Sequence, residues 1–379
     1  MTMKIGVPLE SHPGEKRVAI VPEIVGRLQK LGVEVLIEEG AGIGSHYPDP
    51  AFQEAGAVLI HGQEQLLGEA DLVLRVQPPT MESINLQREG SIAIGFMNPS
   101  QSPEPIKAMC ARRITSLALE LLPRIARAQT MDALTSQASV AGYKAALMAA
   151  DHLGKFLPML TTPTGTIRPA RVLVIGAGVA GLQAIATARR LGAMVEAYDV
   201  RPATKEQVES LGAKFLQATI KAEAEGGYAR ELTAEEKQLQ QEMLAKYIAQ
   251  ADAVIATAAI PGQTAPRIIT REMVESMRPG SVIIDLAAEG GGNCELTQAG
   301  QSVWREDVEV YGPLNVPSML PVHASEMYAK NLFNLVVLMI KDSQLAPDWE
   351  DEVLRESTLT RDGEIKHAPT RQLIEGEKQ

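Results

Sequence analysis

A glycine motif directly after an apolar run is the most specific chemical feature of the sequence. The run 171–175 leads into Gly176, Gly178 and Gly181, which have the spacing GxGxxG, and a helical pattern follows. In this context the first glycine permits a tight turn, the second leaves room for a diphosphate, and the third lets the helix pack closely on the strand. The free N–H groups at the helix start favour an anion. We therefore predict a dinucleotide site here, with Val179 among its contacts.

An acidic residue at the end of the next predicted strand completes this motif. Asp199 follows Gly178 by 21 residues, which is where an acid accepts hydrogen bonds from the adenosine ribose hydroxyls. Val200 and Arg201 come next and are predicted cofactor contacts. The acid favours NAD over NADP, although Arg201 could meet a 2′-phosphate. The alternative is a structural glycine turn with an aspartate that caps a neighbouring loop.

The elements around this motif follow the rhythm of two parallel sheets. Short apolar runs alternate with helical patterns in the first third of the chain and again after residue 170, which is typical of βαβ units. We predict strands at 4–8, 33–38, 72–76, 91–96 and 115–118, then at 171–175, 195–199, 214–216, 253–257, 282–286 and 308–311. The fold class is therefore α/β, with two Rossmann-like doubly wound parallel sheets.

Two long apolar-faced helices mark the limits of the second sheet. Helical periodicity runs over 137–157 and 325–341, and a loop rich in Thr, Pro and Gly is predicted at 161–169. The chain is expected to cross back after the second helix. We therefore predict a discontinuous N-terminal domain, 1–137 plus 321–379, and a dinucleotide-binding domain, 138–320, joined by long helices with a cleft between them.

Composition excludes several other classes of protein. The formal charge of −11, from 47 acidic and 36 basic residues, disfavours nucleic acid as a partner because it repels phosphate backbones. Two cysteines without a CxxC pair disfavour a disulfide framework, and no structural zinc or other metal is expected. Neither a signal peptide nor an apolar stretch of membrane-spanning length is recognisable. The expected location is the cytoplasm.

Beyond the glycine motif, several stretches resemble one family over essentially the full length of the chain. The sequence is similar to the NAD(H)-binding component of proton-translocating nicotinamide nucleotide transhydrogenases, and more distantly to alanine dehydrogenases. The stretches that carry the resemblance are 13–22, 39–42, 124–132, 176–192, 199–208 and 280–291. The resemblance implies bound NAD(H), and NADP(H) on a partner subunit.

The resemblance assigns further residues to the site. In this family, a loop before the connecting helix contacts the nicotinamide end of the cofactor, and a long insertion with a tyrosine closes over the nucleotide. The matching residues for hydride transfer are Arg124, Gln129, Asp132 and Thr135. The matching cofactor contacts are Ile125, Ala126, Thr130, Met131, Gly227, Tyr228 and Ala259. The loop 124–137 could instead be a capped helix start with solvated charges, and 234–249 an ordinary solvated helix.

Two substitutions separate the enzyme classes. An amino-acid dehydrogenase must move a proton as well as a hydride, and alanine dehydrogenases use a lysine and a histidine where this chain has Gln77 and Asn98. Arg17 matches their substrate-carboxylate arginine but could equally be part of a structural ion pair. Hydride exchange between two nicotinamides requires positioning rather than an acid or base.

The sequence therefore favours a transhydrogenase subunit over an alanine-dehydrogenase-like enzyme or a nucleotide-sensing protein without chemistry. The resemblance implies a homodimer that works with a membrane-embedded subunit and an NADP(H)-binding subunit. The chain would then lie at the inner face of the cell membrane through these partners. Proton translocation would reside in the membrane partner. For Asp285 and Glu289, a place near the cofactor and a capping role in the glycine-rich turn remain alternatives.

Overall fold

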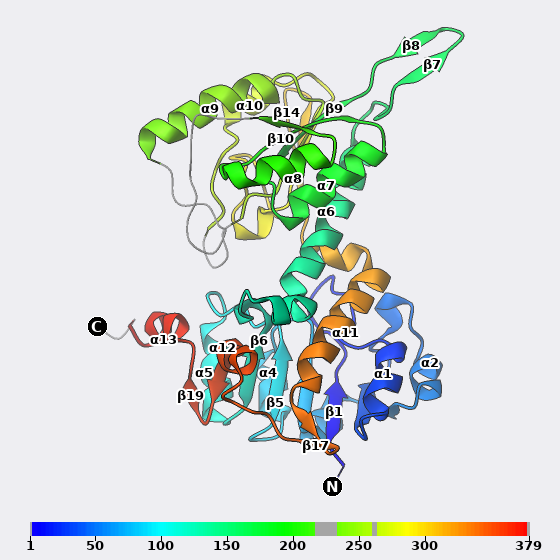
Figure 1. Cartoon of the computed structure of the whole chain (residues 1–379), viewed down its shortest axis with the longest axis vertical. Helices are drawn as coiled ribbons and strands as arrows, with labels where there is room; N and C mark the ends of the chain where they lie inside the picture. Colours follow the sequence, from blue (N-terminus) through cyan, green and yellow to red (C-terminus); the bar gives the residue numbers. More distant parts are fainter. Residues whose placement is uncertain (1, 217–232, 260–263, 377–379) are drawn as a thin grey trace. The chain divides into compact units, whose positions relative to one another are not determined.

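The chain divides into two compact units. The computed structural model describes residues 2–216, 233–259 and 264–376. Unit 1 comprises Met1–Gln137 with Ser318–Gln379, and unit 2 comprises Ala138–Pro317. Each unit is built around one large sheet (Figure 1).

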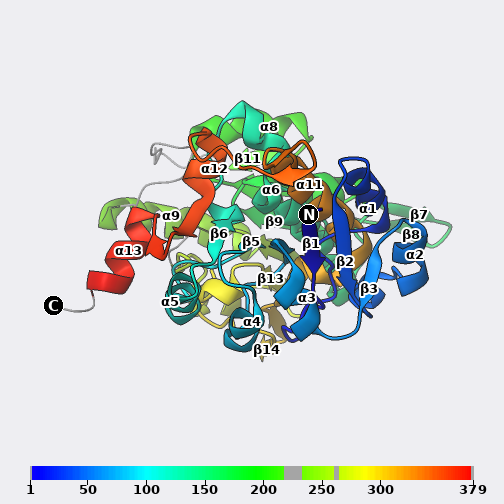
Figure 2. The ribbon, with the colours of Figure 1, turned by 90° about the horizontal axis from the view of Figure 1, so that it is seen from below.

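Unit 1 contains a sheet with the strand order β19-β18-β6-β5-β4-β1-β2-β3. The first six strands in sequence pair in parallel, in the order 3-2-1-4-5-6 that characterises doubly wound dinucleotide folds. Figure 2 shows β1, β2 and β3 side by side. The strands are β1 (Lys4–Val7), β2 (Glu34–Glu38), β3 (Val58–Ile60), β4 (Leu72–Leu74), β5 (Ile92–Gly95), β6 (Thr115–Ala118), β18 (Thr358–Arg361) and β19 (Glu364–Ile365).

Helices cover this sheet and enclose its core. Most strand residues are buried, because strands in a parallel sheet are covered on both faces. Proline stands at the start of α1 and α5, where its missing N–H costs no helical hydrogen bond. The helices from the N-terminal segment are α1 (Pro22–Gln29), α2 (Asp49–Glu54), α3 (Gln63–Glu69), α4 (Met81–Leu86) and α5 (Pro103–Ala111).

The C-terminal segment completes the core of unit 1. Helix α11 (Pro321–Val337) buries Tyr328, Leu332 and Leu335 against the first sheet, and β18 pairs with β6. This pairing and that of β19 with β18 are antiparallel, so the sheet is not parallel throughout. The rest of the segment forms β16 (Ile340–Lys341), β17 (Gln344–Leu345), α12 (Glu352–Ser357) and α13 (Ala368–Glu375).

Unit 2 repeats the doubly wound order in its own sheet. The strand order is β11-β10-β9-β12-β13-β15-β14, in which all neighbours are parallel except the edge strand β14. The glycine motif follows β9, the strand at which the order reverses, and ligands of open α/β sheets bind beside such a point. The strands are β9 (Arg171–Ile175), β10 (Met194–Tyr198), β11 (Lys214–Leu216), β12 (Ala253–Ala256), β13 (Val282–Asp285), β14 (Ser302–Arg305) and β15 (Val308–Tyr311).

The helices of unit 2 differ from the predicted elements in two places. The connecting helix α6 (Ala133–His152) starts earlier and ends earlier than predicted. The predicted loop 161–169 is wrong in part, because β7 (Leu160–Thr162) and β8 (Gly165–Ile167) form an antiparallel hairpin there. Thr162 and Gly165 pair across this hairpin, and Gly165 supplies the positive φ that its turn needs. The remaining helices are α7 (Val179–Arg190), α8 (Lys205–Ser210), α9 (Ala234–Ile248) and α10 (Arg271–Glu275).

Candidate functional site

The glycine turn has the three features that a dinucleotide site needs. Gly176 has a φ of 93°, and its N–H donates to the Tyr198 carbonyl at 2.8 Å. A Cβ on Gly181 would lie 1.9 Å from the Gly176 oxygen, so only glycine lets α7 approach β9 this closely. By contrast, a Cβ on Gly178 would have no heavy atom within 4 Å. The requirement for glycine at 178 is therefore not set by packing within the protein.

The start of α7 offers free backbone donors. Gly178 is the N-cap residue, it is extended, and no side chain caps the helix. The Val179 side chain is 38% exposed. The first N–H groups of a helix have no partner within the helix, and the helix dipole favours an anion beside them. The turn and the helix start together form an anion-binding arrangement on unit 2.

Asp199 lies beside the turn, but its carboxylate is already bonded within the protein. Its Oδ2 accepts the N–H of Ala177 at 2.7 Å, which ties β10 to the glycine turn. Arg201 donates its backbone N–H and its Nε to Oδ1, and its Nη2 to Oδ2, at 2.8, 2.9 and 2.8 Å. This ion pair raises the pKa of Arg201. The structure therefore brings Asp199 and Arg201 together, and Val200 is half-buried between them.

The loop after β12 is held by Asn293, a residue that no sequence motif had indicated. The Asn293 side chain accepts the Ala258 N–H at 3.0 Å and donates to the carbonyls of Ala258 and Pro266 at 2.8 and 2.9 Å. Asn293 is fully buried. The available signal was an asparagine directly after three consecutive glycines. Ala259, a predicted cofactor contact, is exposed in this loop.

Asp285 holds Asn293 in turn and so takes the capping role rather than a place at the cofactor. Its carboxylate accepts the N–H groups of Ala287, Asn293 and Cys294 at 3.0, 2.7 and 3.0 Å, and the Thr297 hydroxyl at 2.6 Å. Glu289 accepts the N–H of Asn315. The glycine-rich turn 288–293 is thus fixed by a buried carboxylate.

Part of the predicted insertion is an ordinary packed helix. Thr233 and Glu236 form a capping box at the start of α9, and Leu244 and Ile248 are buried in the core of unit 2. The solvated-helix interpretation therefore needs correction on one side of α9, which is packed. Gly227 and Tyr228, the predicted contacts in this insertion, lie outside the described residues.

The predicted nicotinamide loop is a 3₁₀ segment followed by a helix start. Ala126–Met131 form the 3₁₀ turn, and Thr135 lies in the first turn of α6 rather than in a loop. Asp132 caps α6, because its carboxylate accepts the Thr135 N–H at 2.9 Å and hydroxyl at 2.6 Å. This is the geometry of a capped helix start, and it also holds the Thr135 hydroxyl in place. Arg124 and Gln129 are exposed.

Neighbouring residues anchor this segment to unit 1. Ala128 and Met131 are buried in the core, and Ile125 packs against it, so the Met131 side chain faces inward. The Thr130 carbonyl accepts the side-chain amides of Asn331 and Asn334 on α11 at 2.9 and 3.0 Å. Ala126 is exposed at the start of the turn. The exposed polar side chains of the segment therefore stand on a rigid base.

Arg17 belongs to a buried polar cluster in unit 1. It donates to both carboxylate oxygens of Glu15, at 2.8 and 2.6 Å, and to Gln137 at 2.8 Å. Gln77 donates to Glu15 at 2.7 Å. Burial alone would raise the pKa of Glu15, yet the hydrogen bonds and charge of Arg17 and the bond from Gln77 lower it to about 2. Arg17 is thus part of a structural ion pair.

Neither residue at the alanine dehydrogenase positions is a proton donor or acceptor for a substrate. Gln77 is an amide whose nitrogen is bonded to Glu15. Asn98 has a φ of 44°, and its backbone N–H donates to Glu120 at 2.7 Å. Amide side chains do not titrate in the physiological range. Proton chemistry of the amino-acid dehydrogenase type has no group at these positions.

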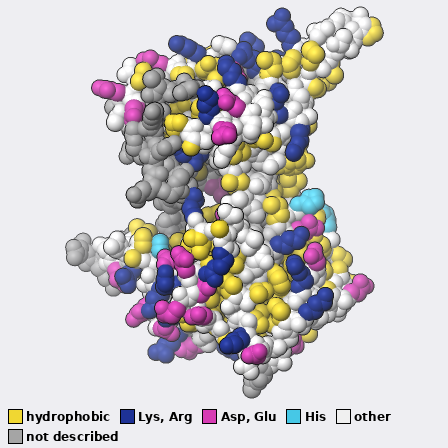
Figure 3. Space-filling view, in the orientation of Figure 1, with side chains coloured by type: hydrophobic (Ala, Val, Ile, Leu, Met, Phe, Trp, Pro, Cys, Tyr) yellow, Lys and Arg dark blue, Asp and Glu magenta, His cyan; other side chains and the backbone are white. Residues whose placement is uncertain are grey.

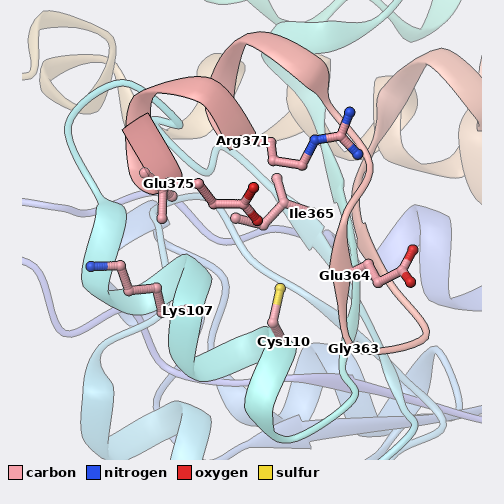
Figure 4. A pocket seen from close by; sticks show the side chains of 8 residues that line it. Lys107, Cys110, Gly363, Glu364, Ile365, Arg371 and Glu375 are labelled. Atoms are coloured by element: carbon pink, nitrogen blue, oxygen red, sulfur yellow. The ribbon is translucent and has the colours of Figure 1, made fainter. Parts of the chain in front are cut away.

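A cavity in unit 1 lies among none of the predicted site residues. It has a volume of about 520 Å³ and is formed by α5, the turn before β19, and α13 (Figure 4). Its walls carry Lys107 and Arg371 beside Glu364 and Glu375. Acidic and basic side chains are likewise intermixed on the visible face of this unit (Figure 3). Burial raises the pKa of the Cys110 thiol to about 11, so this thiol is protonated at neutral pH.

The described residues contain neither a metal cluster nor a membrane-spanning helix. No group of three or more His, Cys, Asp and Glu side chains in the described ranges has the geometry to hold a metal ion. Among the same residues, no helix has the length and apolar character needed to cross a membrane. Cys110 and Cys294 are both free thiols.

Comparison with protein families gives two matches that together span most of the chain. Residues 6–141 match the N-terminal domain of alanine dehydrogenase/PNT, and residues 145–368 match the C-terminal domain of the same family. The division between the two matches falls within α6.

Individual relatives include both branches of this family. The chain is 47% identical to the first portion of the two-piece NAD(P) transhydrogenase subunit alpha of Rhodospirillum rubrum, over 96% of this chain and 98% of that protein. It is 46% identical to NAD(P) transhydrogenase subunit alpha of Haemophilus influenzae, over 96% of this chain and 71% of that protein. Alanine dehydrogenase of Mycolicibacterium smegmatis is 30% identical, over 96% and 94%.

Solved structures agree with these matches. The transhydrogenase of Sinorhizobium meliloti superposes with a TM-score of 0.87 at 45% identity, over 96% of this chain and 99% of that one. An L-alanine dehydrogenase with 24% identity superposes with a TM-score of 0.83 and thus shares the fold. The chain therefore belongs to the alanine dehydrogenase/PNT family, and within it resembles the NAD(P) transhydrogenase alpha subunits more closely than the alanine dehydrogenases.

Proposed function

We propose that this chain is the NAD(H)-binding subunit of a proton-translocating, Re/Si-specific transhydrogenase. It binds NAD(H) on unit 2 and exchanges a hydride with NADP(H) held by a partner subunit. The observation that carries the proposal is the glycine turn at α7. Gly178 has open space where a Cβ would be, and the helix start beside it has no side-chain cap. A diphosphate can approach the backbone there and accept the free N–H groups.

Each predicted cofactor contact has a distinct part in this proposal. The turn residues Gly176 to Gly181, with Val179, hold the diphosphate, and the segment 199–201 holds the adenosine ribose. Ala259 lies at the carboxyl edge of the sheet, where parallel α/β folds bind ligands. Gly227 and Tyr228 remain proposed contacts with the adenosine. The domain that binds NAD(H) is proposed as 138–320, with 1–137 plus 321–379 as the other domain.

We propose that the nicotinamide end is held by the segment 124–135. Its side chains Arg124, Gln129, Asp132 and Thr135 orient the ring for hydride transfer, and Ile125, Ala126, Thr130 and Met131 contribute contacts through this rigid segment. Two features support this role. The segment is anchored by Ala128 and Met131, and the Thr135 hydroxyl is fixed by Asp132. A fixed hydroxyl and amide suit orientation of a ring, for which small displacements are costly.

Hydride exchange between two nicotinamides fits the chemistry that the chain lacks as well as what it has. Gln77 and Asn98 replace the proton-transferring residues of an amino-acid dehydrogenase, and a nicotinamide-to-nicotinamide transfer requires no such group. The chain should accordingly not reduce NAD in the presence of L-alanine. Sustained NADH formation with L-alanine would favour the dehydrogenase alternative instead.

The proposed assembly contains more than this chain. The relatives are named as subunits, some of them as one portion of subunit alpha. We propose that this chain works as a homodimer with an NADP(H)-binding subunit and a membrane-embedded subunit. Proton translocation is then a property of the membrane partner, and this chain is located on the cytoplasmic side of the membrane through that complex.

The first test is calorimetric titration of the full chain with NADH and NADPH. Wild-type protein should bind NADH more tightly than NADPH. Gly178→Ala should bind NADH at least ~10-fold more weakly, because its methyl group occupies the space that the diphosphate needs. Its melting temperature should be unchanged, because a Cβ there meets nothing in the protein. NADPH binding equal to or tighter than NADH binding would refute the assignment.

Hydride transfer itself requires the complex. Wild-type chain mixed with the NADP(H)-binding subunit of a related transhydrogenase should catalyse hydride transfer between NADH and an NADP analogue. The Gly178→Ala variant should be slow at low NADH concentration and recover in part at high concentration. Absence of transfer from a wild-type chain that binds NADH would leave nucleotide sensing as the better interpretation.

A further inference from the structure

The side chain of Arg201 covers the carboxylate to which the adenosine ribose is expected to bind. Nε donates to Oδ1 of Asp199 at 2.9 Å and Nη2 donates to Oδ2 at 2.8 Å, so the two groups form a parallel, bidentate pair. The Asp199 side chain is 5% exposed and the Arg201 side chain is 21% exposed. The pair is thus largely shielded from water, where charge-assisted bonds of this geometry are strong.

Counting donors shows that this carboxylate is fully used. Besides the two side-chain bonds, Oδ2 accepts the N–H of Ala177 and Oδ1 accepts the N–H of Arg201. An ionised carboxylate has about four acceptor sites, two on each oxygen. The two backbone donors belong to the glycine turn and to the chain after β10, so they cannot leave without moving the backbone. Only the guanidinium can leave and free two acceptor sites.

The charge of the site depends on the same side chain. A carboxylate alone would repel the 2′-phosphate of NADP(H), and this repulsion is the usual basis for choosing NAD(H). With Arg201 in its bidentate position the pair is close to neutral. The guanidinium fork also matches the geometry of a phosphate group. The residue that pairs with Asp199 therefore weakens the discrimination that Asp199 provides.

We propose that Arg201 is a specificity-determining residue that competes with the ribose for Asp199. The 2′ and 3′ hydroxyls of NAD(H) must displace the Nε and Nη2 bonds to reach the carboxylate. The 2′-phosphate of NADP(H), by contrast, meets the guanidinium. Arg201 thereby holds the affinity for NAD(H) below its possible maximum and narrows the preference over NADP(H). This inference rests on the proposed NAD(H) site of unit 2.

The test compares Arg201→Gln, Arg201→Lys and a matched control in nucleotide titrations. Arg171→Gln is the control, because it removes the same charge from the start of β9, at the end of the strand opposite Gly176, where Arg171 pairs with Glu196 at 3.2 Å. For Arg201→Gln we expect NADH to bind about threefold more tightly and NADPH about threefold more weakly. The ratio of the two dissociation constants then rises ~10-fold. The control should change this ratio less than twofold.

The lysine variant separates the two effects of the guanidinium. Lys keeps the positive charge but lacks the planar fork. Arg201→Lys should therefore tighten NADH binding while leaving NADPH binding near the wild-type value. This variant also carries the test if Arg201→Gln fails to fold, which its circular dichroism spectrum and melting temperature would reveal.

Several outcomes would overturn the inference. One is an unchanged ratio of dissociation constants in Arg201→Gln. Another is an equal loss of affinity for both nucleotides, which would make Arg201 a plain structural or shared-phosphate contact. Weaker NADH binding in both variants would mean that the guanidinium assists the ribose instead of competing with it. If wild-type protein binds no NADH, the proposed function itself has failed, and the inference fails with it.

Discussion

The carbonyl oxygen of Gly176 lies where a side chain at Gly181 would have to be, 1.9 Å from the position of a Cβ. This close approach brings the first turn of α7 against the end of β9. Gly181→Ala should therefore force the helix away from the strand, because the obstructing atom belongs to the backbone and cannot rotate aside. Overpacking of this kind costs about 1–3 kcal/mol. Urea unfolding should show the loss.

Gly178→Ala is the matched control for this prediction. A Cβ at Gly178 meets no atom within 4 Å, so its free energy of unfolding should change by less than ~0.5 kcal/mol. The two variants should thus separate stability from nucleotide binding. Equal stability of the two alanine variants would show that the close contact at Gly181 does not constrain the fold.

Asn293 should be important for the loop after β12. Asn293→Ala removes all three hydrogen bonds that its side chain makes to Ala258 and Pro266. Leaving buried backbone groups without partners costs about 1–3 kcal/mol for each group. We expect a loss of about 3 kcal/mol in the free energy of unfolding, and faster hydrogen exchange at the Ala258 amide.

Gln298→Ala is a suitable control for the Asn293 variant. Gln298 lies in the same region of the chain, but its side chain is exposed, so its substitution should change stability by less than ~0.5 kcal/mol. A similar, small effect of both variants would show that the Asn293 bonds do not hold the loop.

The segment 124–135 should affect hydride transfer more than NADH affinity. Asp132→Asn keeps the size of the side chain and one acceptor for the Thr135 N–H, so helix α6 should lose less than ~1 kcal/mol of stability. Displacement of the Thr135 hydroxyl should slow transfer to the NADP(H)-binding partner, by up to ~100-fold. Stopped-flow rates and NADH titrations on the same protein would measure the two quantities separately.

Arg127→Gln provides the comparison for Asp132→Asn. Arg127 is in the same 3₁₀ segment, but its exposed side chain pairs with Asp351 at 2.7 Å, and exposed pairs contribute little. Its transfer rate should remain near the wild-type value. A collapse of NADH affinity in Asp132→Asn with an unchanged transfer rate at saturation would mean that the segment is only a capped helix start.

Glu15 should make unit 1 sensitive to acid. Its pKa is about 2 in the folded protein, against an ordinary value of 4.5 for a glutamate. A lowered folded pKa contributes stability above pH 4.5 that is lost as the pH falls toward 2. The difference corresponds to about 3 kcal/mol. Chemical unfolding measured from pH 6 to pH 2.5 should show this loss.

Replacement of Glu15 should remove this part of the pH dependence. Glu15→Gln should be less stable than wild type at pH 7, because Arg17 loses its buried partner, and its stability should vary less between pH 4.5 and 2.5. Lys107→Gln, which removes an exposed pair with Glu104, should keep the wild-type slope. An unchanged slope in Glu15→Gln would show that other carboxylates cause the acid sensitivity.

Local sequence patterns determined most of the fold. Each parallel strand is a short apolar run, and each helix has its own periodicity, so these elements are encoded by neighbouring residues. The GxGxxG spacing placed Gly176 at a positive φ and Gly181 at the close contact with β9. Edge elements were harder, because β3 and β14 lie at sheet edges and the hairpin β7–β8 is largely exposed, so their apolar signal is weak.

Only the tertiary structure decided how the polar groups pair. Gln77 reaches Glu15 across 62 residues of sequence, and Asn331 reaches Thr130 across 201. No periodicity encodes such partners, because a hydrogen bond depends on where the folded backbone brings two groups together. Even the neighbours Asp199 and Arg201 could be read from the sequence in two ways. The chain alone placed an acid and a base beside the ribose, and the fold decided that the base covers the acid.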